Sequence, residues 1–266
     1  MYYFSSVEPI YYLLPIIGLI VGLLGTMLGG GGGFVFLPIL TLLIGTPAQT
    51  AVITSLVAAL PICMVGAGGH FRKGNVDVRL GMLFSIFGIL GAFLGAAIAG
   101  WITPTQLKMA FGIYALLMAV NIYFDTLNKK RAELANVASG SPSSRPRFAL
   151  GAIFGSLAGL ITGTFGTSGT APVLAGLFSM RLGLKIVIGT SLMIVLVNTF
   201  FAVGAHFLIA QIDLTLVIFL TSGSAIGAVI GPLLLSNSSR VNKSENSIRY
   251  GYAAVMAIIG VLMLIG

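Results

Sequence analysis

Apolar residues run along this chain in long blocks, separated by short polar or glycine-rich stretches. Most of the blocks approach the length of about 20 residues that a helix needs to cross a bilayer. The pattern therefore predicts an all-α polytopic membrane protein. The predicted apolar segments run near 10–28, 33–45, 47–68, 79–100, 105–124, 148–165, 170–181, 184–207, 213–235 and 249–266.

One polar stretch in the middle of the chain divides these segments into two groups of five. Residues 126–147 are rich in Ser, Pro and charge, which is typical of a linker. We expect a first transmembrane repeat over 1–125, a cytoplasmic linker over 126–147 and a second repeat over 148–266. The opening MYYFSSVEPI has no basic region and no small-residue cleavage motif, so no cleavable signal peptide is expected.

Composition agrees with a membrane protein and excludes other classes. Hydrophobic residues make up 57% of the chain and charged residues 8%, against about 25% charged in soluble domains. A disordered chain, a nucleic-acid-binding protein and an ordinary cytosolic enzyme are all excluded. Cys63 is the single cysteine, so we expect no disulfide framework, no metal site and no cofactor.

The distribution of positive charge predicts the topology. All of the 14 Lys and Arg residues except Lys108 follow an odd-numbered apolar segment. Because cationic loops remain in the cytoplasm, these odd-numbered loops should be cytoplasmic. Both termini of the chain should then be external.

The two halves also resemble each other in sequence. Each holds an odd number of segments, so the second should be inverted in the membrane, an arrangement found in secondary transporters with a substrate site near the midplane. Matched positions are offset by 137 residues at first and by 136 after a one-residue gap. They include Gly22, Gly29 and Gly32 with Gly159, Gly166 and Gly169, Thr54 and Ser55 with Thr190 and Ser191, and 69–78 (GHFRKGNVDV) with 205–214 (AHFLIAQIDL).

Two glycine-rich breaks, GTMLGGGGG at 25–33 and GTFGTSGT at 163–170, precede the two short segments 33–45 and 170–181. Either segments 1–2 and 6–7 form re-entrant hairpins with tips near mid-membrane, or segments 1 and 6 cross fully and the short helices are tilted. We favour the hairpins, because non-helical backbone at membrane depth must be buried or line a cavity. Helix N-termini would then point at the tips and favour a small anion.

Hydroxyl and amide side chains inside the spans extend this candidate site. Such hydroxyls either contact a substrate or bond to a carbonyl of their own helix, and Asn198 is either a ligand or an interhelical hydrogen-bonding group. The expected substrate-binding residues are Gly30, Gly31, Gly32, Gly33, Thr54, Ser55, Thr167, Ser168, Gly169, Thr170, Thr190, Ser191 and Asn198.

Two histidines end matched apolar segments, each seven residues before an aspartate. His70 precedes Asp77, and His206 precedes Asp213. Because histidine titrates near neutrality, these four residues are candidates for gating or proton handling. The alternative is an interfacial group that fixes the helix end.

These motifs resemble the TauE/SafE sulfite exporter family over nearly the whole chain. The first copy is GLLGTMLGGGGGFVFLP (22–38) followed by ITS (53–55), and the second is GLITGTFGTSGTAPVLA (159–175) followed by GTS (189–191). The second copy departs from the pattern, since Thr167, Ser168 and Thr170 replace glycines. The resemblance implies transport of small sulfur-containing anions such as sulfite, thiosulfate or sulfoacetate across a bacterial inner membrane.

We therefore expect a secondary transporter that works by alternating access, and not an enzyme. The membrane potential drives an anion outward by about 2.3 kcal/mol per charge per 100 mV, which favours export; import would need a coupled proton or cation. An anion channel with the same midplane site is the alternative. The expected partners are a small anion and the lipid bilayer, with no nucleic acid.

Overall fold

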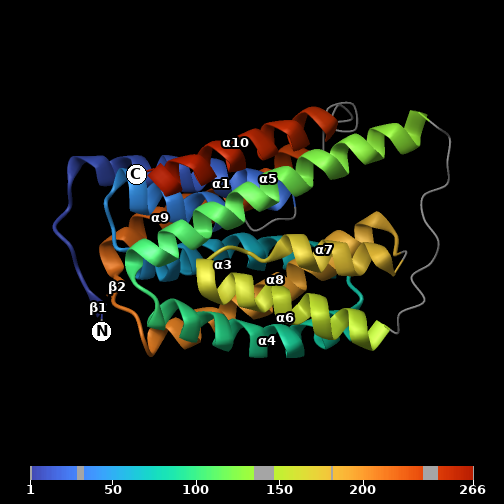
Figure 1. The fold of residues 1–266 in the computed structure, drawn as a ribbon, viewed down its shortest axis with the longest axis horizontal. Coiled ribbons are helices and arrows are strands. Elements are labelled where there is room, and N and C mark those ends of the chain that lie inside the picture. The colour runs from blue at the N-terminus through green and yellow to red at the C-terminus, as the bar shows by residue number, and fades with distance from the viewer. Residues whose placement is uncertain (1, 29–32, 135–146, 181, 236–244, 266) are drawn as a thin grey trace.

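The computed structural model describes residues 2–28, 33–134, 147–180, 182–235 and 245–265. Helices dominate these residues (Figure 1). They are η1 (Pro9–Leu13), α1 (Leu14–Leu28), α2 (Gly33–Pro38), the π-helix η2 (Ile39–Leu43), α3 (Ala48–Arg72), α4 (Val78–Trp101), α5 (Pro104–Leu134), α6 (Arg147–Phe165), α7 (Thr170–Ser179), α8 (Leu184–Phe207), α9 (Leu214–Leu235) and α10 (Glu245–Ile265).

The polytopic helical class is confirmed. Among the described residues, 7 helices are long and apolar enough to cross a membrane. Helix α5 continues beyond its apolar block to Leu134, into the stretch expected to form the linker. The run LNKKRAEL at 127–134 holds good helix formers and no Gly or Pro, so the helix continues after the apolar block ends.

Two strands were not expected from the sequence. β1 (Tyr2–Tyr3) pairs in parallel with β2 (Ile212–Asp213), which joins the N-terminal segment to the α8–α9 connection. Such two-residue strands are too short to produce an alternating pattern.

Glycines bring two pairs of helices into backbone contact. A Cβ on Gly18 or Gly22 of α1 would overlap the backbone of α9 at Leu220 and Ser224. A Cβ on Gly155 or Gly159 of α6 would likewise overlap α4, at Phe84 and Gly88. Small residues allow close approach of this kind in membrane helices. Residue numbers rise together along both helices of each pair, so both pairs are parallel.

Helices α3 and α8 occupy the interior. The apolar span of α3 is 67% buried and that of α8 is 56% buried, against 28% for α5. Helix α5 packs instead against α10 at the edge of the molecule, where Gly112 and Gly260 approach each other.

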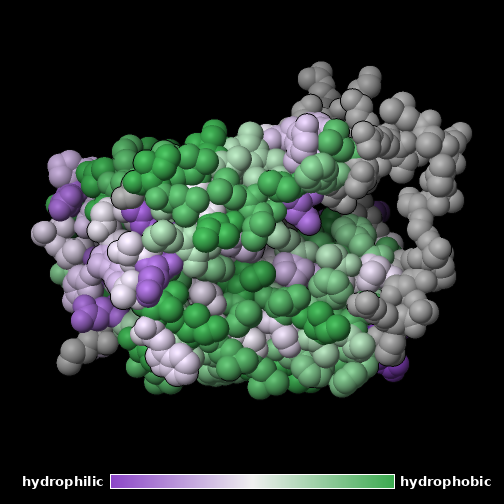
Figure 2. Space-filling view, in the orientation of Figure 1, coloured by the Kyte–Doolittle hydropathy of each residue, from purple (hydrophilic) through white to green (hydrophobic). Residues whose placement is uncertain are grey.

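The two ends of the molecule differ in the chain segments they hold. Strand β1 and the C-terminal end of α10 lie at the left-hand end in Figure 1, whereas α5 ends and α6 begins at the right-hand end. The first and last described residues therefore lie at the same end of the molecule. The external location of this end stays a prediction. Figure 2 shows hydrophobic side chains across the middle of one face and hydrophilic ones gathered mainly toward the left-hand end.

Candidate functional site

The start of α2 meets the turn between α6 and α7 inside the helical bundle. A Cβ on Gly33 would lie 3.0 Å from the Gly166 carbonyl oxygen, 3.5 Å from the Thr167 Cα and 3.6 Å from the Ser168 nitrogen. The two glycine-rich segments, far apart in sequence, therefore touch. Gly30, Gly31 and Gly32 lie outside the described residues.

The turn from α6 into α7 depends on two glycines. Gly166 and Gly169 have φ angles of +66° and +52°, a left-handed conformation that side chains rarely adopt. Gly166 also lies against α3, since a Cβ there would be 2.6 Å from the Val52 carbonyl oxygen. Gly169 is the N-cap of α7 and has no side chain with which to cap that helix. The first backbone N–H groups of α7 therefore face the turn.

Hydroxyl groups surround this turn and are shielded from solvent. Thr167 is 3% exposed and Ser168 is 6% exposed. The Thr170 hydroxyl donates a hydrogen bond of 3.0 Å to Ser168 Oγ. The predicted residues of the second break thus form one buried polar cluster.

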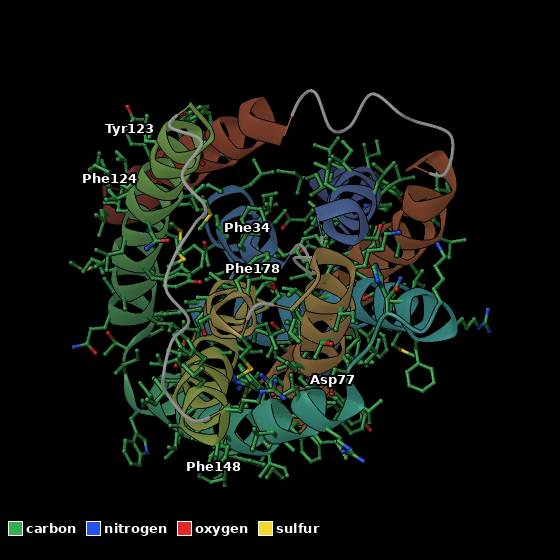
Figure 3. The ribbon with its side chains drawn as sticks, turned by 90° about the vertical axis from the view of Figure 1, so that its right-hand side faces the viewer. Phe34, Asp77, Tyr123, Phe124, Phe148 and Phe178 are labelled. Carbon is green, nitrogen blue, oxygen red and sulfur yellow. The ribbon has the colours of Figure 1, made fainter. Side chains whose placement is uncertain are left out.

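Aromatic rings from α5 and α6 form a wall beside the cluster. Tyr114 stacks on Phe165 with ring centroids 5.2 Å apart, and Phe111 meets Phe165 edge-on at 5.7 Å. Phe165 ends α6, immediately before the turn. In the view along the molecule from its right-hand end, Phe34 of α2 lies centrally, whereas Tyr123, Phe124 and Phe148 lie toward the periphery (Figure 3).

The predicted Thr-Ser pairs are buried, but three of their hydroxyls are used within their own helices. Thr54 donates to the Thr50 carbonyl at 2.8 Å, Ser55 to Ala51 at 2.7 Å and Ser191 to Ile188 at 2.9 Å. Thr190 instead accepts a hydrogen bond of 2.9 Å from the Asp77 backbone N–H. Ser55 lies about one turn beyond Val52, whose backbone contacts Gly166 of the glycine turn.

Asn198 of α8 lies over Gly88 of α4, where a Cβ would collide with its carboxamide. It is fully buried, and neither its oxygen nor its nitrogen has a hydrogen-bond partner among the described residues. The interhelical hydrogen bond considered from the sequence is therefore not made here.

The two histidines lie in different surroundings. His206 is 1% exposed and its Nε2 lies 2.6 Å from the Gly163 carbonyl oxygen in the last turns of α6. His70 is half-buried, and its Cβ lies against the first turns of α8 at Gly189. Gating or proton handling by either residue stays a prediction.

Both aspartates accept hydrogen bonds at helix N-termini. Asp77 Oδ1 accepts from the Leu80 N–H at 3.1 Å, and Asp213 Oδ1 accepts from the Thr215 N–H at 3.0 Å. An Asp directly before an apolar run is a recognised N-cap signal, which our sequence reasoning passed over. Their gating role also stays a prediction.

Two further polar groups near the site were missed by sequence reasoning. Ser85 of α4 is 4% exposed, and its hydroxyl has no partner among the described residues. Thr162 of α6 lies against Gly169 and donates to the Ala158 carbonyl at 2.8 Å. Each is a polar residue within an apolar span, a signal that could have identified them. No group of three or more His, Cys, Asp or Glu side chains suited to a metal ion occurs within the described part of the chain.

Comparison with known proteins identifies the family of this chain. The family described as "Sulfite exporter TauE/SafE" matches residues 14–263. The chain is 28% identical over 226 residues to "Probable membrane transporter protein YdhB" of Bacillus subtilis (strain 168), covering 84% of this chain and 87% of that protein. It is 26% identical over 257 residues to a "Probable membrane transporter protein" of Xylella fastidiosa (strain Temecula1), covering 93% and 92%. No solved structure matches significantly. Since the family match spans nearly all the residues that build the bundle and its glycine turns, the chain belongs to the TauE/SafE sulfite exporter family and is a membrane transporter.

Proposed function

We propose that the protein is a secondary transporter of small sulfur-containing anions, such as sulfite, thiosulfate or an organosulfonate like sulfoacetate. One observation carries this proposal: the contact between Gly33 and the Gly166–Ser168 turn. It brings together the start of the helix Gly33–Leu43 and the start of α7 (Thr170–Ser179), two short apolar helices. Backbone N–H groups at such N-termini favour negative charge without any Lys or Arg.

The packing of the helices supports two inverted repeats. Gly22 approaches the Ser224 backbone, and the matched Gly159 approaches the matched Gly88 backbone. The same correspondence relates Gly18 with Leu220 to Gly155 with Phe84. Each half thus contributes one helix to a parallel pair with the other half. This interlocked arrangement fits a site between repeats that faces the two sides alternately.

The course of the short helices supports the hairpin interpretation. In Figure 1, α7 runs back from the turn toward the end of the molecule at which α6 begins. Helix α6 and helix α7 then form a re-entrant hairpin, with α1 and α2 as its counterpart from the other side. Export follows from the membrane potential, which drives an anion outward.

Flux measurements with purified protein in liposomes test this proposal. We expect saturable movement of sulfite, thiosulfate or sulfoacetate, with no comparable movement of acetate. The Ser168→Ala variant should weaken apparent affinity by up to about tenfold, through the loss of one hydrogen bond to a charged guest. Ser191→Ala should have a smaller effect, because that hydroxyl donates within its own helix.

Two controls make the test decisive. Ser222→Ala removes an exposed hydroxyl that donates to the Phe219 carbonyl, so transport should be unchanged. No response to any of the three sulfur anions would refute the proposal. Conductive flux that does not saturate would instead indicate an anion channel.

A further inference from the structure

The carboxamide of Asn198 lies in the same layer of the bundle as the N-terminus of α7. An apolar cluster joins α4, α6, α7 and α8 through Phe84, Ala158, Val173 and Ile194. Positions three or four residues apart lie on the same face of a helix. Moving one turn along each of these four helices toward the glycine turn therefore gives the next layer of residues. Its members are Gly88, Thr162, Thr170 and Asn198.

Contacts within this layer agree with that placement. Gly88 has two close neighbours: the Asn198 side chain covers its Cα, and Gly159 of α6 lies against its backbone carbonyl. Thr162, one turn beyond Ala158, meets Gly169 at the start of α7, where a Cβ would lie 2.6 Å from the Thr162 hydroxyl oxygen. The Asn198 side chain is therefore level with the turn that forms the proposed anion site.

Two buried polar side chains of this region have no partner. Neither carboxamide atom of Asn198 has a hydrogen bond among the described residues, and neither does the hydroxyl of Ser85, which precedes Gly88 by one turn on the same face of α4. A buried amide without a partner is costly. An apolar residue would fill the position more stably, as Ile62 does at the matched position of the first half, where it is fully buried.

The chemistry of these groups differs from that of the glycine turn. Backbone N–H groups at a helix start offer only donors. A carboxamide offers two donors and one acceptor, and a serine hydroxyl offers one of each role. A fully deprotonated anion can use the donors but leaves the carboxamide oxygen unpaired. A monoanion that still carries a proton can satisfy both.

We propose that Asn198, with Ser85, selects an oxyanion that carries a proton, such as hydrogen sulfite, over one that carries none, such as a sulfonate. This inference rests on the proposed function and assigns a specificity-determining pair to its site. Helix α4 covers the carboxamide in this conformation, so contact with the guest requires α8 and α4 to separate, as alternating access demands.

Competition in proteoliposomes tests the inference. Hydrogen sulfite and methanesulfonate carry the same charge at mildly acidic pH, but only the first carries a proton. We expect the unmodified protein to prefer hydrogen sulfite by about tenfold, since one unpaired buried acceptor costs about that much. Asn198→Leu should lose this preference, and Ser85→Ala should reduce it. Ser222→Ala, on the exposed face, should keep it in full.

A stability measurement separates this role from a structural one. Removing an unpartnered buried amide should leave the melting temperature of Asn198→Leu unchanged or raise it, whereas a structural role predicts a lower value. If that variant does not fold, Gly88→Ala combined with Asn198→Ala replaces it, because the three atoms nearest to a Cβ at Gly88 all belong to the Asn198 side chain.

The outcomes distinguish the two proposals. Transport that persists with an unchanged preference in the Asn198 variants overturns the inference and leaves the proposed function intact. An unmodified protein that transports both anions equally also overturns it. Absence of transport for every sulfur anion removes the proposed function itself.

Discussion

His206 and His70 occupy matched positions in the two halves of the chain, but His206 is buried whereas His70 is only half-buried. His206 contacts the Gly163 carbonyl of α6, whereas His70 lies beside the first turns of α8. The aspartates that follow differ in the same way. Asp213 is 2% exposed, and Asp77 is only partly buried.

The N-terminal segment accounts for the difference between the two aspartates. Strand β1 pairs with β2, where Tyr3 lies opposite Asp213. The Thr215 hydroxyl donates a hydrogen bond of 3.0 Å to the Ser5 carbonyl. The matched connection around Asp77 has no strand pairing among the described residues. The two halves therefore share their helix capping and helix packing, but the N-terminal segment covers only the α8–α9 connection of the second half. In the proposed alternating access, the states open to the two sides of the membrane then need not have equal free energies.

The largest expected effect concerns the helix packing that the halves share. Gly159→Leu places a side chain into the backbone of α4 at Gly88, and Gly22→Leu does the same to α9 at Ser224. We expect each to cost about 3 kcal/mol or more and to abolish the folded monodisperse protein, as judged by size-exclusion chromatography. Gly68→Leu, where a Cβ meets nothing within 4 Å, is the control and should be tolerated. A folded Gly159→Leu protein would contradict the described packing of α4 against α6.

The next effect tests the two histidines directly. His206→Ala removes a buried ring and its contact with the Gly163 carbonyl, and should destabilise the protein by about 2–3 kcal/mol. His70→Ala should cost below about 1 kcal/mol, because half-buried positions lose less packing. Thermal unfolding in detergent measures both. Equal losses would show that the difference in burial has no energetic consequence.

The sequence predicted the helices far better than it predicted these differences. Apolar block length defined α8 to the residue. The matched glycines Gly22 and Gly159 were visible as a repeat, but which helices they pack against became clear only in the structure. The burial of His206 depends on packing against Gly163 of α6, which is distant in sequence. Its motif is nearly the same as that of His70, so no local pattern distinguishes the two.

The candidate site shows the same limit. Left-handed glycines and hydroxyls in the GTFGTSGT break were visible in the sequence, and Gly33 does meet that turn. Whether the Ser55 and Ser191 hydroxyls bind a substrate or a carbonyl of their own helix could not be predicted. A hydroxyl in a helix always has such a carbonyl within reach. Asn198 could be noticed as polar, but its lack of a partner depends on which residue of α4 faces it.

A smaller effect compares the two capping aspartates. Asp213→Ala should cost about 1–2 kcal/mol and Asp77→Ala about 0.5–1 kcal/mol, because Asp213 is more deeply buried and also lies 3.4 Å from the Ser5 N–H. The corresponding Asn variants should retain most of the stability, since Asn is also a good N-cap residue. Thermal unfolding midpoints rank the four variants. A larger loss at Asp77 would reverse the ranking that burial predicts.

The smallest effect isolates the contribution of the N-terminal segment. Thr215→Val keeps the shape of the side chain but removes its hydrogen bond to the Ser5 carbonyl. Because this bond is only partly buried, its loss should cost about 0.5 kcal/mol, at the low end for a hydrogen bond. Thr126→Val is the matched control, because that hydroxyl donates to the Ile122 carbonyl of its own helix at 2.7 Å. If Thr215→Val lowers the unfolding midpoint no more than Thr126→Val does, the strand pairing must hold the N-terminal segment without this bond.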